Sequence, residues 1–205
     1  NMKKTIVYID GENLLHRVVD VLVEEKVIRR KTEITRFDFT YLLQEVLGKE
    51  SERGGLEIRY YGTRIKASGL EGTPRKKALE MAEIQRRLKR LLEKQGITFI
   101  MCGTLQWREG HRCMQCGKQT PIFQEKCVDV RIAVDIVNEA RAKHRAIVVS
   151  SDSDLLPAIR SARQAGAQIE YVTLSHRVNW ALARNADKTH DIASSRVIEA
   201  YRRSL

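Results

Sequence analysis

The apolar residues of this chain alternate between short continuous runs and stretches with helical spacing. Runs rich in β-branched or aromatic residues are typical of strands buried in a parallel sheet. They cover residues 5–9, 56–61, 97–101, 146–150 and 168–172. Between these runs, apolar residues recur every three or four positions, which predicts helices. The predicted helices cover residues 14–22, 37–47, 74–94, 128–142 and 154–165, with shorter ones near 177–185 and 194–203.

Strands that alternate with helices at this spacing predict an α/β fold with a mostly parallel sheet covered on both faces. A chain of 205 residues is long enough for one such domain, so we expect a single domain over residues 2–205. The polar residues 103–125 interrupt the rhythm and are interpreted as a small cysteine-containing insertion. Ligands of open sheets bind outside the carboxyl ends of the strands, so candidate chemistry is sought there.

Four aspartates are predicted near these strand ends. Asp10 follows the first run, Asp152 and Asp154 follow the run at 146–150, and Asp129 begins the helix after the insertion. Each alone is also explained as a helix N-cap or turn residue. Together, four converging carboxylates repel one another unless cations hold them, and oxygen ligands suit Mg²⁺ or Mn²⁺. Two such ions activate water and stabilise the leaving oxygen of a phosphodiester.

The charge balance favours a polyanionic partner. The chain has 37 Lys and Arg against 26 Asp and Glu, a net charge of +11, so nucleic acid is the first expectation.

Neither a run of about 20 apolar residues nor an apolar N-terminal signal is present, so we expect no membrane span and a reduced, cytoplasmic location. GxGxxG, GxxxxGK[ST] and GxSxG are absent, which argues against nucleotide-binding and serine-hydrolase folds that use them.

Three blocks of sequence resemble the signature of the NYN (LabA-like) domain, a branch of the PIN-like nuclease superfamily. They are YIDGEN at 8–13, EKCVDVRIAVD at 125–135 and VVSSDSDLLP at 148–157. The resemblance implies a PIN-like three-layer α/β/α sandwich and a metal-dependent ribonuclease site that cleaves single-stranded or structured RNA. The chain departs from the family at Ser151, which replaces the usual Gly, and at Cys127, where Gly is frequent.

The resemblance also assigns roles to individual residues. Asp10, Asp129, Asp152 and Asp154 would be the catalytic metal ligands. Asn13 would be an outer ligand or positioning group, and Asp135 and Ser153 would have supporting roles. Asp135 lies six residues after Asp129, about 240° around a helix, so it does not share the face of Asp129.

The insertion contains a candidate structural zinc site. Cys113 and Cys116 have the spacing of a zinc knuckle, followed by a glycine, and His111 lies nearby. The remaining ligands would come from His111, Cys102, Cys127 or another chain. The alternative is a hairpin with two reduced thiols.

Basic and aromatic residues provide candidate contacts to nucleic acid. Arg75, Arg86, Lys89 and Arg90 of the 74–94 helix are candidates for phosphate contacts, although the same charges also suit a solvated helix face. Tyr60, Tyr61 and Trp107 are candidates for stacking on bases, but alternation along a strand places at least one of the tyrosines in the core.

Two functions remain open from the sequence. The first is a metal-dependent ribonuclease, favoured because all four acids are present. The second is a non-catalytic RNA-binding or regulatory module on the same scaffold. The sequence does not distinguish an RNA from a DNA substrate, endonuclease from exonuclease action, or a monomer from a homodimer.

Overall fold

A seven-stranded sheet forms the centre of the computed structural model, which describes residues 4–29, 36–48, 56–108, 110, 112, 114–119, 122–124, 127–140 and 144–204. The strands in this part of the chain are β1 Thr5–Asp10, β2 Leu56–Ile65, β3 Thr98–Arg108, β4 Ile122–Gln124, β5 Arg145–Val149, β6 Gln168–Leu174 and β7 Lys188–Ile192. Their order is β4-β3-β2-β1-β5-β6-β7, and all neighbours pair in parallel except β3 and β4. The predicted mostly parallel sheet is therefore confirmed.

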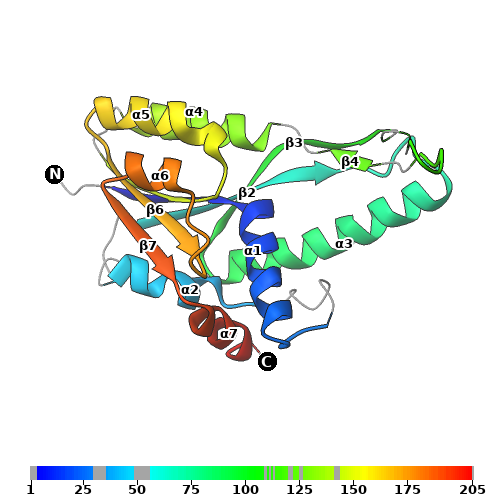
Figure 1. Cartoon of the computed structure of the whole chain (residues 1–205), viewed down its shortest axis with the longest axis horizontal. Coiled ribbons are helices and arrows are strands. Elements are labelled where there is room, and N and C mark those ends of the chain that lie inside the picture. The colour runs from blue at the N-terminus through cyan, green and yellow to red at the C-terminus, as the bar shows by residue number, and fades with distance from the viewer. Residues whose placement is uncertain are drawn as a thin grey trace.

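Helices cover both faces of this sheet (Figure 1). One face carries α1 Gly11–Glu24, α2 Phe39–Leu47, the C-terminal part of α3 Gly72–Lys94, and α7 Ser194–Arg202. The other carries α4 Val128–Ala140, α5 Leu156–Gln164 and α6 Trp180–Asn185. Within the described ranges, no helix is both long and apolar enough to cross a membrane. The three layers are those expected of an α/β/α sandwich.

Two hydrophobic cores lie on opposite sides of the sheet because successive side chains of a strand point to opposite faces. In β1, Val7 and Ile9 join the core under α1, α2 and α7, whereas Ile6 and Tyr8 join the core under α4 and α5. All six residues of β1 are buried. This central position explains the continuous apolar run that predicted the strand.

The structure corrects the sequence prediction in two regions. Strand β7 was not predicted, since Lys188–Ile192 (KTHDI) is a polar edge strand with only Ile192 buried. Strands β2 and β3 also extend beyond their predicted ends, and β3 pairs antiparallel with β4 through Trp107 and Phe123. Part of the predicted insertion is thus a β-hairpin, which extends with the first half of α3 away from the body of the domain (Figure 1).

Of the two departures from the family pattern, only Cys127 requires an unusual backbone. Cys127 has a φ of 84°, in the left-handed region, whereas Ser151 is not among the described residues with positive φ. A side chain in this region costs about 1 kcal/mol, which glycine avoids, although glycine adds entropy to the unfolded chain. We expect Cys127→Gly to raise the free energy of unfolding by up to about 1 kcal/mol, measured by urea denaturation under reducing conditions. A Cys127→Ser variant, which keeps the Cβ, should show no gain.

Candidate functional site

The acidic residues lie near the point where the strand order reverses, at the carboxyl ends of β1 and β5. Asp10 is the last residue of β1, and residues 150–154 follow β5, which pairs directly with β1. Asp129 lies in the first turn of α4, which packs against β1 and against the 3₁₀ turn Ser153–Leu155. Such a reversal point is where ligands bind in open α/β sheets.

Asp10 is the most buried of the four carboxylates, with 5% of its surface exposed. One oxygen accepts a hydrogen bond from the backbone N–H of Asn13 at 3.1 Å and caps α1, and the other accepts from the Ser150 hydroxyl at 2.8 Å. Burial raises the pKa of Asp10, and nearby Asp152 adds to this, whereas the two hydrogen bonds lower it. The site therefore holds a carboxylate whose negative charge is only partly compensated.

Hydrogen bonds connect the loop after β5 to two other elements. The Ser151 N–H donates to the Asn13 side chain at 3.1 Å, and the Ser151 carbonyl accepts from Asn179 Nδ2 at 2.9 Å. The loop also caps itself, since the Asp154 N–H donates to Asp152 Oδ1 at 2.9 Å. These contacts fix the backbone that carries Asp152 and Asp154, and they make Asn13 a positioning residue for it.

Gly11 is required for the close approach of α1 to β2. A Cβ at this position would lie 2.2 Å from the Tyr60 ring and 2.4 Å from the Tyr61 carbonyl oxygen. The Tyr60 hydroxyl also donates to the Gly11 carbonyl at 2.9 Å. The Asp-Gly pair thus places the first turn of α1, and with it Asn13, next to the end of β1.

Mutual repulsion among the carboxylates is visible at Asp129. Burial and then the charges of Asp10, Asp152 and Asp154 together raise the pKa of Asp129 to about 6. A divalent cation would remove this repulsion, and a donor set made only of carboxylate oxygens suits Mg²⁺ or Mn²⁺. The chemistry of the donors thus fits the expected metal. As placed, however, no three His, Cys, Asp or Glu side chains within the described ranges are close enough to share one ion.

The two residues expected to support the site lie differently. Asp135 accepts hydrogen bonds from the Tyr61 hydroxyl at 2.9 Å and from Arg131 Nε at 2.9 and 3.0 Å. It therefore anchors α4 to the sheet, in agreement with its predicted displacement from the face of Asp129. Ser153 is exposed at the start of the 3₁₀ turn.

The predicted phosphate-contacting residues do not form one surface. Arg86 pairs with Glu83 at 2.7 Å and Arg90 lies 4.0 Å from the same carboxylate, whereas Lys89 faces Glu93 at 3.7 Å. Arg75 lines a separate hollow with Leu79 and residues 67–71, near the other end of α3. The four residues thus divide between the two ends of the helix.

Among the aromatic candidates, the tyrosines are excluded from stacking on bases. Tyr60 and Tyr61 are 2% and 0% exposed and belong to opposite cores, so their prediction as base contacts was wrong. Trp107 packs edge-on against Phe123 across the β3–β4 hairpin, with ring centroids 4.8 Å apart.

Sequence reasoning missed Ser150 and Asn179, which bond to Asp10 and to the loop that carries Asp152 and Asp154, and Trp180, which follows Asn179 in the chain. Ser150 lies within a signature block, but its bond to Asp10 depends on the pairing of β1 with β5. Asn179 has no local sequence signal, because its bond to Ser151 joins positions 28 residues apart. Trp180, the next residue, is 68% exposed, an unusual exposure for a large aromatic side chain.

The zinc prediction stays a prediction. Cys113 and His111 lie outside the described residues, and Cys116 is exposed. Cys102 is buried, with its thiol 3.5 Å from the Ile100 carbonyl oxygen.

Comparisons with known proteins give one family match. The family model described as the NYN domain matches residues 4–194, without specifying the LabA-like subtype. No curated protein matches. A crystal structure of a Vibrio parahaemolyticus protein of unknown function aligns with a TM-score of 0.56 at 18% identity, covering 93% of each chain. A structure of a Sir2 enzyme aligns with a TM-score of 0.41 at 12% identity, covering 98% of this chain and 92% of that one.

Proposed function

This chain belongs to the NYN domain family of the PIN-like nuclease superfamily, and on that premise we propose that it is a metal-dependent ribonuclease acting at the carboxyl edge of β1 and β5. The observation that carries the proposal is the placement of four aspartates near the carboxyl ends of β1 and β5, where burial and then the charges of the other three raise the pKa of Asp129. The family implies a nucleic-acid substrate, and the net charge of +11 suits one.

Asp10, Asp129, Asp152 and Asp154 would hold Mg²⁺ or Mn²⁺. When bound, these ions supply an activated water and stabilise the leaving oxygen of a phosphodiester. Asp10 is held in place by its bonds to Asn13 and Ser150. Asn13 and Asn179 hold the loop that carries Asp152 and Asp154 from both sides.

The direct test is incubation of labelled single-stranded RNA and DNA with the protein in Mn²⁺, Mg²⁺ or EDTA. We expect RNA cleavage with either metal and none in EDTA. Binding of RNA without cleavage in any metal would instead support a non-catalytic RNA-binding module. Comparison of the cleavage of RNA with that of DNA shows whether the enzyme prefers ribose or deoxyribose.

Trp180 is the residue we expect to stack on a base of the substrate. It is exposed next to Asn179, whose side chain is bonded to the loop that carries the acids. Stacking of one base on an aromatic side chain contributes about 1–3 kcal/mol. Trp180→Ala should therefore raise the KM for RNA by about 5- to 150-fold with little change in kcat, whereas Trp180→Phe should retain most of the affinity. Equal KM values for the wild type and Trp180→Ala would contradict this role.

A further inference from the structure

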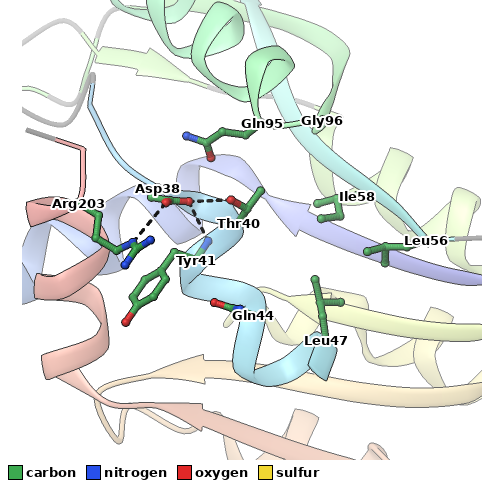
Figure 2. Close-up of a pocket in the computed structure, with 10 residues that line it drawn as sticks. All are labelled: Asp38, Thr40, Tyr41, Gln44, Leu47, Leu56, Ile58, Gln95, Gly96 and Arg203. Atoms are coloured by element: carbon green, nitrogen blue, oxygen red, sulfur yellow. Dashed lines mark hydrogen bonds and ion pairs between the residues drawn. The ribbon is translucent and has the colours of Figure 1, made fainter. Parts of the chain in front are cut away.

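A groove runs across the amino edge of the sheet, at the opposite end from the acidic site. Three adjoining hollows form it and share lining residues. The first lies between α2 and the starts of β2 and β3, and includes Leu56, Gln95 and Arg203 (Figure 2). The second shares Gln95 and Arg203 with it, and the third continues along the last turns of α3. The amino edge thus has one continuous depression.

The charge of this groove is strongly positive. Its cationic lining residues are Arg36, Arg87, Arg90, Lys94 and Arg203. Among the described residues, the lining contains one carboxylate, Asp38, which accepts from the Tyr41 N–H at 2.8 Å and lies 3.9 Å from Arg203. Within the described part of the chain, Arg36 and Lys94 have no carboxylate partner. The groove therefore offers uncompensated cations to a ligand.

The aromatic ring in the groove is not available for stacking. Tyr41 is covered by two guanidinium groups, with Arg196 Cζ 3.5 Å and Arg203 Cζ 4.4 Å from the ring centroid. These contacts also hold Arg203 in place at the groove. Recognition here would rest on charge, which favours the phosphates of a ligand over its bases and is independent of sequence.

We propose that this groove binds the phosphodiester backbone of the same single strand whose cleavage is proposed at the acidic edge, so this inference rests on the proposed function. The two sites are separated by the length of β1, because the groove contains Leu56, which pairs with Thr5, while Asp10 ends the strand. Five rises of about 3.3 Å give roughly 17 Å. This separation runs through the interior of the sheet, so a strand on the surface needs a longer path: only a strand of several nucleotides could reach both sites, whereas a substrate with a single phosphodiester tests the acids alone.

The test compares two triple variants with equal loss of charge. The groove variant is Arg36→Ala/Arg90→Ala/Lys94→Ala. The control variant is Arg160→Ala/Arg184→Ala/Lys188→Ala, exposed cations on α5, α6 and the start of β7 that lie outside the groove. Binding of a long fluorescent RNA oligonucleotide is measured in EDTA, where no metal-dependent cleavage occurs, at several salt concentrations. Three lost phosphate contacts should reduce the log–log salt slope by about 2 in the groove variant, and little in the control.

Equal slopes for the wild type and the groove variant, or equal reductions in both variants, would overturn the proposal. So would a groove variant that loses binding of a polyglutamate peptide but keeps its RNA binding, which would assign the groove to an acidic protein. Hydrolysis of bis(p-nitrophenyl) phosphate with Mn²⁺ tests the acidic site separately. The groove variant should retain full hydrolysis, and a loss comparable to the loss of RNA binding would count against a separate site. Absence of hydrolysis in the wild type would reject the proposed function, while the binding data would still decide the groove.

Discussion

Replacing Asp10 by Asn is expected to reduce metal-dependent RNA cleavage by more than about 100-fold while the fold remains intact. Changes to the partners of a metal ligand already cost about 10- to 100-fold, so loss of a ligand charge should cost more. The fold should survive because Asn is as good an N-cap as Asp, and its amide can donate to the Ser150 hydroxyl that now donates to Asp10. Single-turnover cleavage in Mn²⁺ measures the effect, with circular dichroism to check the fold.

A matched pair of variants separates the charge at the site from charge in general. In Asp152→Asn the side-chain oxygen can still accept the hydrogen bond from the Asp154 N–H. We expect this variant to lose RNA cleavage by a factor similar to that of Asp10→Asn. Asp20→Asn alters a carboxylate of α1 that pairs with Arg177 at 3.1 Å, and it should cleave RNA like the wild type. Full cleavage by both Asp10→Asn and Asp152→Asn would remove the catalytic assignment.

Replacing Asp129 by Asn is expected to stabilise the metal-free protein at neutral pH. The folded-state pKa is about 6, above the ordinary value of 3.8, so the folded carboxyl keeps its proton where the unfolded chain has lost it. The contribution of this carboxyl group to the free energy of unfolding is fully present below about pH 4. It decreases as the pH rises from about 4 to 6 and is absent above that range. The shift corresponds to at most about 3 kcal/mol, and because Asp129 is only half-buried we expect about 1–2 kcal/mol.

Thermal denaturation in EDTA between pH 4 and 8 measures this effect. For a chain of this length, about 1–2 kcal/mol corresponds to roughly 2–8 °C in Tm. Asp129→Asn should exceed the wild type at pH 7.5 and match it near pH 4, and Mn²⁺ should raise the Tm of the wild type more than that of the variant. A variant that is less stable than the wild type at pH 7.5 in EDTA would show that burial and repulsion do not destabilise the charged Asp129 carboxylate in the folded protein.

Local patterns in the sequence determined the strands and helices of the domain body and the placement of the acids. A buried central strand such as β1 needs apolar side chains on both faces, so residues 5–9 are recognisable without any partner. Asp10 directly follows such a run and Asp152 comes two residues after another, and in a parallel sheet the carboxyl ends of the strands lie at one edge. Their placement at one edge of the sheet therefore follows from the order of strands and helices, whereas their being side by side depends on the pairing of β1 with β5.

The tertiary structure decided whatever depends on contacts between distant residues. Strand β7 gains its stability from pairing with β6, although its own sequence is polar. Asn179 supports the acidic loop across 28 positions, and Tyr61 is buried by α4, as its bond to Asp135 shows. The basic groove likewise joins Arg36, the end of α3 and Arg203, whereas the sequence suggested a stripe along one helix. The physical reason is that the hydrophobic periodicity of a sequence shows which face of its own helix or strand a residue occupies. Which residues of other elements contact that face depends on how the elements pack.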